Sequence, residues 1–385
     1  MATSPKRRSM LARLALSAVV TLLVIGAVEI GVRLIAGSIP ELPQHSWISG
    51  QFQVDHHVKW TLKPGATMGQ GEHINADGMR DHPLADPKPD AQIRVLVLGD
   101  SSVFGAGVDL EQTFTQRLEL ALNPPGTPSA DRRIQLLNGG IPGYSTYQVL
   151  ERLRRSAHLG LDGVILYNIS DSQEPEGWND DLWFHYGAPV HLVLRHAAMY
   201  RWAHRRVRQR AKPRTSAGAD PTTLRVHIRR YRENLATLRH EVGDMGAALF
   251  YVVPPMSSDI PGAAPMQNPY EPPGGPPRLP SYLPSDDATA QSLQQRLAWL
   301  EGQPALASSI QDYRSALALD GYRGGLPVVD GPAVFQAAWA EQPEAERPLL
   351  LDPVHPSPTG HQLLADALQP ALERWLSTQQ PTTGR

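Results

Sequence analysis

One stretch of the sequence constrains the fold more than any other. Residues 94–107 read R-V-L-V-L-G-D-S-S-V-F-G-A-G. The run from Ile93 to Leu98 is almost entirely apolar and has the length of a buried parallel strand, and Gly99 permits a sharp exit from it. The Gly-Asp-Ser turn therefore lies at the carboxyl end of a strand, the edge at which open α/β sheets bind ligands.

Ser101, in that turn, has two interpretations. If a helix begins just after the turn, the Ser101 hydroxyl lies beside unpaired backbone N–H groups, which are ready to stabilise an oxyanion. This favours a nucleophile. Asp and Ser are also the commonest N-caps, and for an isolated strand-Gly-Asp-Ser turn the cap is the more frequent role. The rest of the chain has to decide between them.

Short apolar runs alternate with helical patterns along the remainder of the chain. This alternation is typical of a parallel, doubly wound sheet. Helices are expected over 114–122, 145–158, 191–212, 222–242, 288–318 and 359–376. The four further strands are expected at 134–137, 164–167, 247–253 and 326–330.

Composition excludes several classes of function. Lys+Arg 36 against Asp+Glu 38 gives a formal charge of -2, so no global basic field indicates a nucleic-acid partner. The chain has no cysteine, which excludes disulfides, thiolate metal sites and a cysteine nucleophile. With 41% hydrophobic residues the chain can bury a core. We expect no metal and no cofactor.

The amino terminus indicates export. A basic cluster precedes an uncharged apolar run, Leu14 to Val28, and a span over Leu11–Ile30 reaches the roughly 20 residues that a membrane requires. The basic flank keeps the N-terminus cytoplasmic and places the rest of the chain outside, in the periplasm or beyond. A cleaved signal peptide ending near Ala36 and Ser38 is the alternative, although its intervening region is long and charged. The basic cluster is Lys6, Arg7, Arg8 and Arg13.

These patterns divide the chain into four parts. Residues 1–36 are the basic tip and transmembrane anchor, 37–90 a turn-rich stalk or lead-in, 91–378 the main domain, and 379–385 a tail. In the lead-in, the segment from Asn75 to Asp81 has the character of a structured surface turn, with Arg80 available for an ion pair.

Two segments of the main domain are compositionally unusual. Residues 195–212 are rich in arginine on a helical pattern, so this segment either contacts anionic lipid or an acidic polymer or, more often for such runs, is a solvated helix face. Residues 254–285 are dominated by proline and must form a loop. Because this loop leaves the end of a strand, it lies on the same sheet edge as Ser101 and either borders the site or is a passive insertion.

A second chemical motif lies before the last helix. Leu351-Asp352-Pro353-Val354-His355-Pro356 places an Asp and a His three residues apart in a loop restricted by two prolines. A hydrolytic serine needs a base within hydrogen-bond reach, and the base needs a carboxylate to orient it. Asp352 and His355 can supply both, although Asp-x-x-His alone is a weak signal. His361 is the competing base, but its place at a helix start fits packing or capping better.

Together these motifs are more specific than any one of them. Gly-Asp-Ser after the first strand, Asn138-x-Gly140-x-Pro142-Gly143 after the second, a polar turn with Asp171 after the third, and Asp-x-x-His before the last helix resemble the four blocks of the SGNH (GDSL) hydrolase family. The likeness runs from about residue 75 to 376. It includes Asn75-x-x-Gly78-x-Arg80 and resembles a membrane-anchored branch of that family.

The resemblance implies a fold and a set of roles. The fold is a three-layer α/β/α domain of flavodoxin-like topology, with about five parallel strands in the order 2-1-3-4-5. Ser101 is then the nucleophile, His355 the general base and Asp352 its orienting partner. The backbone N–H groups of Ser101 and Gly143 form the oxyanion hole.

The third oxyanion donor is where this sequence departs from the family. The family uses an Asn side chain, and Ser170 stands at that position in Asn168-Ile169-Ser170-Asp171. Either the Ser170 hydroxyl or the Asn168 amide then completes the hole. Since one such donor is worth about 3 kcal/mol, the departure indicates a slower hydrolase or a site adapted to another acceptor.

The function implied is an exported serine esterase that acts on an acylated small molecule or glycan, such as the O-acetyl groups of a cell-envelope polysaccharide. Two alternatives stay open. A polysaccharide O-acyltransferase would use the same three residues with a sugar hydroxyl in place of water. The second alternative is a non-catalytic glycan-binding protein on the same fold, and its main support is the presence of Ser170 where the family has an Asn.

Overall fold

The computed structural model describes residues 5–36, 50–68, 72–128, 131–171, 180–210, 225–261, 283–302, 310–341 and 348–379. Its centre is a five-stranded, fully parallel sheet with the strand order β4-β3-β5-β6-β7. In chain order this is 2-1-3-4-5, so the predicted flavodoxin-like topology is confirmed. The strands are β3 (Ile93–Gly99), β4 (Ile134–Asn138), β5 (Gly163–Tyr167), β6 (Ala248–Val253) and β7 (Val328–Asp330).

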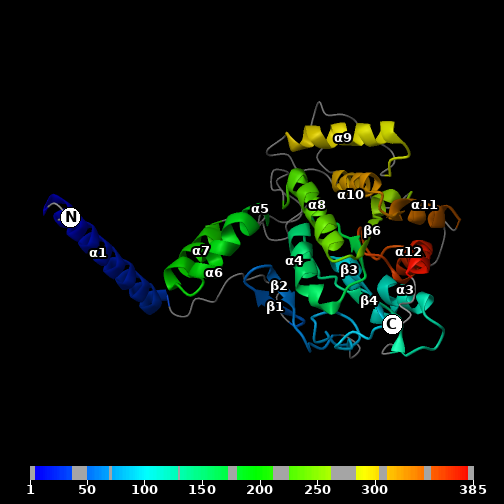
Figure 1. The fold of residues 1–385 in the computed structure, drawn as a ribbon, viewed down its shortest axis with the longest axis horizontal. Coiled ribbons are helices and arrows are strands. Elements are labelled where there is room, and N and C mark those ends of the chain that lie inside the picture. The colour runs from blue at the N-terminus through cyan, green and yellow to red at the C-terminus, as the bar shows by residue number, and fades with distance from the viewer. Residues whose placement is uncertain are drawn as a thin grey trace.

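Helices cover both faces of the sheet, because side chains of successive strand residues point to opposite faces. Leu96 and Leu98 of β3 lie in one core cluster, with apolar residues of α4 (Thr146–Ser156), α8 (Ile228–Asp244) and α10 (Ile310–Gly324). Val95 and Val97 lie in the other, with α3 (Phe114–Leu122), α11 (Gly331–Glu341) and α12 (Pro358–Thr378). The result is the three-layer arrangement expected from the sequence (Figure 1).

The helical predictions differ from the structure in four places, one of which is the helix expected over 222–242: α8 begins only at Ile228. The helix expected over 191–212 is two helices, α6 (Ala188–Leu194) and α7 (Ala198–Arg210), because the chain turns between them. The pattern over 288–318 is likewise divided between α9 (Asp287–Glu301) and α10. Helix α11 was not predicted, since its apolar residues have little amphipathic periodicity.

The lead-in contains a β-hairpin that belongs to the core. Strand β1 (Phe52–Asp55) pairs antiparallel with β2 (Lys59–Leu62), and Trp60 is completely buried in the same cluster as the α4 and α8 residues. Arg80 is also buried, at 4% exposure, so the interpretation of its segment as a surface turn was wrong. The reason is that Arg80 has partners inside the domain, which are described below.

Helix α1 (Pro5–Ala36) projects away from the α/β body, and α6 and α7 lie between the two (Figure 1). Its segment Ala12–Ile35 has a mean hydropathy of 2.3 and is long and apolar enough to cross a membrane. Of the predicted Pro-rich loop 254–285, residues 262–282 lie outside the described residues, as do residues 37–49 of the lead-in and 380–385 of the tail. The remaining short helices are α2 (Ser101–Phe104) and α5 (Asp180–Leu182), which continues as a π-helical turn, Trp183–Gly187.

Candidate active site

Ser101 is the first residue of α2, directly after β3. The Asp100 carboxylate caps this short helix by accepting the Ser102 N–H at 3.0 Å, and Gly105 ends it in the left-handed conformation at φ 82°. The cap is therefore Asp100, which leaves the Ser101 side chain free for another role. The Ser101 N–H, at the helix start, has no acceptor among the described residues.

The Ser101 hydroxyl meets the loop that precedes α12. Its Oγ lies 2.7 Å from Nε2 of His355, and the opposite ring nitrogen, Nδ1, lies 2.5 Å from Oδ2 of Asp352. Residues 254 positions apart in the sequence are thus joined in one chain of hydrogen bonds. With the ring proton on Nδ1 facing the carboxylate, Nε2 is free to accept the proton of the serine.

The loop that carries Asp352 and His355 is held by its own backbone. The other Asp352 oxygen, Oδ1, accepts the N–H groups of Val354 and His355, both at 2.9 Å, and Leu351 N–H donates to the His355 carbonyl. The Ser102 hydroxyl donates to the Val354 carbonyl at 3.1 Å and so connects this loop directly to α2. The pair is therefore positioned against the turn that carries Ser101, and not only by contacts within its own loop.

The Asp352 carboxylate is held in its ionised form. Partial burial opposes ionisation, but the hydrogen bonds from His355 and from two backbone N–H groups outweigh it and lower the pKa of Asp352 below its ordinary value. An ionised Asp352 can stabilise the imidazolium that forms when His355 takes a proton. The Asp352 and His355 side chains are 45% and 22% exposed, so the site opens at the surface.

The loop after β4 carries Gly143 and approaches α2 closely. A Cβ at Gly140 would lie 2.3 Å from the Phe104 backbone nitrogen, so only glycine allows this approach. Gly143 has φ 74°, which again requires glycine, and its N–H has no acceptor among the described residues. Trp60 also holds this loop, because its indole N–H donates to the Pro142 carbonyl at 3.0 Å. Sequence reasoning missed Trp60, because it lies in the segment interpreted as a stalk.

Both side chains considered for the third oxyanion donor already donate to a carboxylate. The Ser170 hydroxyl donates to Oδ2 of Asp100 at 2.6 Å, and the Asn168 amide donates to Oδ2 of Asp171 at 2.6 Å. A hydroxyl has a single proton, so Ser170 links its loop to the Asp100 cap and has none left for an oxyanion. The Ser170 hydroxyl is therefore committed to Asp100, whereas the Asn168 amide has a second N–H and stays a predicted donor.

A fully buried cluster of charged side chains, Lys59, Asp180 and Arg225, holds the loop that carries Ser170. The Arg225 guanidinium donates to the Ser170 carbonyl at 2.9 Å and to the Asp180 carboxylate at 2.9 Å. Lys59, from the lead-in hairpin, makes an ion pair with the same carboxylate. Burial alone would raise the pKa of Asp180, but these two cations overcome it and lower the pKa instead. The hairpin and the site loop are therefore connected through one ionised carboxylate.

Arg80 holds the other end of α2. Its guanidinium donates to the carbonyls of Phe104, Gly105 and Val108 at 2.7–3.0 Å and to the Glu72 carboxylate at 2.9 Å. The next residue, Asp81, accepts the backbone N–H of Asn138 at 2.8 Å, at the start of the loop that carries Gly143. Adjacent residues of one turn thus fix two loops of the site.

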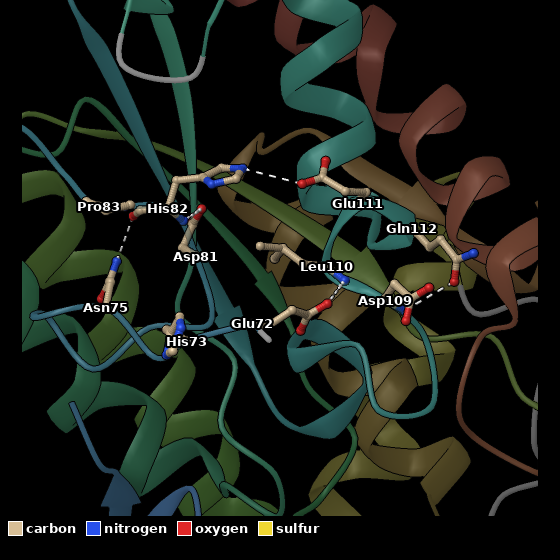
Figure 2. A pocket seen from close by; sticks show the side chains of 10 residues that line it. All are labelled: Glu72, His73, Asn75, Asp81, His82, Pro83, Asp109, Leu110, Glu111 and Gln112. Carbon is tan, nitrogen blue, oxygen red and sulfur yellow. Dashed lines mark hydrogen bonds and ion pairs between the residues drawn. The ribbon is translucent and has the colours of Figure 1, made fainter. Parts of the chain in front are cut away.

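A cavity of about 570 Å³ lies beside this turn (Figure 2). None of Ser101, Asp352 and His355 lines it. Glu72 faces it and also accepts the Leu110 N–H at 2.7 Å, so the polar groups there serve to hold the chain after α2. Its lining residues are Glu72, His73, Asn75, Asp81, His82, Pro83, Asp109, Leu110, Glu111 and Gln112.

His361, the competing base, is fully buried. Its Nδ1 accepts the Phe114 N–H at 3.1 Å, and its ring stacks on that of Phe114 at a centroid distance of 5.9 Å. Burial, with a smaller contribution from Arg117, lowers the pKa of His361 to about 3. A neutral, buried ring that accepts a backbone N–H has a packing role, as its position at the helix start suggested.

The fold is similar to that of GDSL lipolytic proteins. A lipolytic protein of the G-D-S-L family from Veillonella parvula has 11% sequence identity and a TM-score of 0.38, covering 73% of this chain and 99% of its own. A lipase/acylhydrolase from Enterococcus faecalis has 16% sequence identity and a TM-score of 0.38, and the match covers 76% of this chain and 100% of its own.

A third similar structure is an acetylxylan esterase from Geobacillus stearothermophilus. It has 16% identity and a TM-score of 0.36, covering 73% of this chain and 94% of its own. No protein-family model matches the sequence, and no curated protein matches it.

In the described part of the chain, no group of three or more His, Asp or Glu side chains is arranged to hold a metal ion. The Ser101 site consists of a hydroxyl, an imidazole, a carboxylate and backbone N–H groups. These groups suffice for acyl transfer through a serine.

Proposed function

We propose that this protein is a serine ester hydrolase of the SGNH type, with Ser101 as nucleophile, His355 as general base and Asp352 as its orienting carboxylate. The observation that carries the proposal is the pair of hydrogen bonds at His355, 2.7 Å to Ser101 Oγ and 2.5 Å to Asp352 Oδ2. A non-catalytic binding protein has no need to keep this relay assembled between two distant loops.

In the reaction, His355 Nε2 takes the proton of Ser101 as Oγ attacks the ester carbonyl, and Asp352 stabilises the resulting imidazolium. The carbonyl π electrons move to oxygen, and we assign that oxyanion to the N–H groups of Ser101 and Gly143. Collapse of the tetrahedral intermediate breaks the C–O bond to the leaving alcohol, which receives the proton from His355. Water then attacks the acyl-Ser101, with His355 again as base, and releases the acid.

The substrate we propose is a short acyl ester on a bulky carrier, such as an O-acetyl group of a cell-envelope or secreted polysaccharide. The support is the exposure of the Asp352 and His355 side chains, since a triad that opens at the surface admits an ester attached to a polymer. We propose that α1 anchors the protein in the membrane, with the α/β domain outside. The apolar span Ala12–Ile35 and the cations that precede it support this orientation.

The test is hydrolysis of p-nitrophenyl acetate and of an acetylated oligosaccharide by the detergent-solubilised full chain. We expect release of free acetate that is abolished in both Ser101→Ala and His355→Ala. Wild-type turnover in either variant would refute the assignment. If acetate appears on an added unacetylated oligosaccharide instead of in solution, the acyl-Ser101 chemistry stands but the acceptor is a sugar hydroxyl, and the enzyme is an O-acyltransferase.

A further inference from the structure

The helical hairpin of α6 and α7, residues 188–210, has an apolar outer surface near its tip. One side of the hairpin is anchored in the protein, where the buried His191 ring packs against Trp183 and Tyr200 at centroid distances of 5.6 and 5.8 Å. The hairpin also exposes large apolar side chains, of which Val193 is 78% exposed. These are Val190, Leu192, Val193 and Leu194 on α6 and Met199 and Trp202 on α7.

The tip of the hairpin is bound to the outer end of α1. The Glu29 carboxylate accepts the N–H groups of Ala198 and Met199 at 2.6 and 2.9 Å, and Arg33 donates to the His196 carbonyl at 3.1 Å. Figure 1 shows α6 and α7 between α1 and the α/β body. At 1.5 Å per residue, Glu29 lies about 25 Å along the helix from Ala12, close to the boundary of a hydrocarbon core about 30 Å thick. With α1 as the proposed anchor, the tip therefore lies near the outer end of that core.

The charges on the hairpin are all of one sign. Residues 188–210 include six arginines and no aspartate or glutamate. Arg205 and Arg206 are exposed, and the Arg206 guanidinium lies 5.4 Å from the centroid of the Trp202 ring. A tryptophan beside an arginine suits the interface between hydrocarbon and headgroups, because the ring enters the apolar boundary while the guanidinium binds phosphate.

We propose that the tip of the α6–α7 hairpin is a second membrane contact. Leu192, Val193 and Leu194 enter the outer boundary of the bilayer, and Arg205 and Arg206 bind the phosphates of its lipids. The inference rests on the proposed role of α1 as a membrane anchor. An acidic polymer would also attract the arginines, but it gives no reason for a valine at 78% exposure beside the end of a membrane span. The contact would hold the Ser101 site at a fixed height and orientation above the membrane.

The absence of cysteine from the chain allows a direct test. The full chain is reconstituted into liposomes of phosphatidylethanolamine and phosphatidylglycerol with a nitroxide on one introduced cysteine. Three variants are compared: Val193→Cys at the tip, Leu22→Cys in α1, and Leu120→Cys on α3 as the control. Leu120 is a matched control because, like Val193, it is an exposed aliphatic residue on a helix, at 45% exposure, but it lies in the α/β body.

Power saturation then compares access of oxygen, which concentrates in hydrocarbon, with access of a water-soluble nickel chelate. We expect the oxygen-to-nickel ratio at Val193 to be severalfold higher than at Leu120, and the ratio at Leu22 to be higher still. If Val193 matches Leu120 while Leu22 reports hydrocarbon, the hairpin contact is refuted and the anchor stands.

Two further outcomes also decide. If the label at Leu22 is accessible to nickel and not to oxygen, the proposals of the anchor and of the hairpin contact are both refuted. If the label at Val193 is accessible to nickel in liposomes but loses that access when a soluble acidic polysaccharide is added, the partner is that polymer and the proposal is wrong. Ester hydrolysis by each labelled variant is measured separately, so the outcome for the membrane contact is independent of the outcome for the Ser101 chemistry.

Discussion

Ser170 shows how one hydroxyl changes the chemistry expected of a site. The sequence placed it where a side-chain oxyanion donor is expected, but its proton goes to the Asp100 carboxylate, which also caps the helix that begins at Ser101. Ser170 thus holds the Asp100 cap in front of the proposed nucleophile, Ser101. The proposed oxyanion hole then contains the two backbone N–H groups of Ser101 and Gly143.

This assignment predicts a small effect for Ser170→Ala. Loss of a true oxyanion donor lowers kcat by about 10²- to 10³-fold. Loss of the hydrogen bond from Ser170 to Asp100, which only supports the turn, should lower kcat by less than about 10-fold. The measurement is kcat for p-nitrophenyl acetate. A loss of about 10²-fold or more, in a variant with unchanged thermal stability, would show that Ser170 does contact the oxyanion.

His361 gives a prediction about pH and stability. Its pKa of about 3 in the folded protein lies below the ordinary value near 6.5, so at intermediate pH the unfolded chain binds the proton more readily. The free energy of unfolding therefore decreases as the pH falls below about 6.5, and it goes on decreasing down to about pH 3. At pH 5 the loss attributable to this residue is about 2 kcal/mol.

Guanidinium unfolding of the full chain in detergent, at pH 7.5 and pH 5, measures this loss. In His361→Asn the amide oxygen can still accept the Phe114 N–H but does not titrate, so the variant should lose about 2 kcal/mol less than the wild type over this interval. Equal losses in the two proteins would contradict the account.

At the scale of elements, the four-residue helix α2 depends on a guanidinium from the lead-in. Arg80 donates to three carbonyls at the end of α2 and beyond it and to the Glu72 carboxylate. A guanidinium with five N–H groups can satisfy these four acceptors, whereas an ammonium group with three cannot. We expect Arg80→Lys to lower the free energy of unfolding by about 2–4 kcal/mol and to lower kcat more than it raises KM.

Arg154→Lys is the matched control for this substitution. Arg154 also pairs with a carboxylate, that of Glu241, but it is 50% exposed, and exposed pairs contribute less than about 1 kcal/mol. Chemical unfolding and steady-state kinetics of both variants make the comparison. If Arg80→Lys behaves like Arg154→Lys, Arg80 does not hold α2.

The elements that the sequence predicted well are those defined by local pattern. The five strands are short, mostly apolar runs, and the structure places them within one or two residues of the prediction. The Ser101, Asp352 and His355 motifs could be found because each follows a recognisable strand or precedes a helix. The structure then supplied the distances that join them.

What the sequence could not show depends on contacts between distant segments. Arg80 has the appearance of a surface residue, since its three carbonyl partners lie 24–28 positions away along the chain. Trp60 lies in a turn-rich segment, and only the folded structure shows its indole against Pro142. The proton of Ser170 likewise goes to a carboxylate 70 positions away. Local periodicity carries no information about such partners.

For the whole molecule, α1 and the hairpin tip predict firm membrane association. Full-length protein should stay with the membrane fraction after washing with high salt and with alkaline carbonate, because about 20 apolar residues bury far more surface than a peripheral contact. Immunoblotting of the fractions measures this. Quantitative release by carbonate would indicate a protein without a spanning helix, including one released by signal cleavage.

The central claim, that Ser101 is activated by His355, can be tested most directly by covalent labelling. The full chain is treated with a fluorophosphonate, which phosphonylates activated serines, and the modified residue is located by mass spectrometry of its peptides. The account predicts a single label on the peptide that contains Ser101, absent in Ser101→Ala and strongly reduced in His355→Ala. A label on another serine, or equal labelling in His355→Ala, would contradict it.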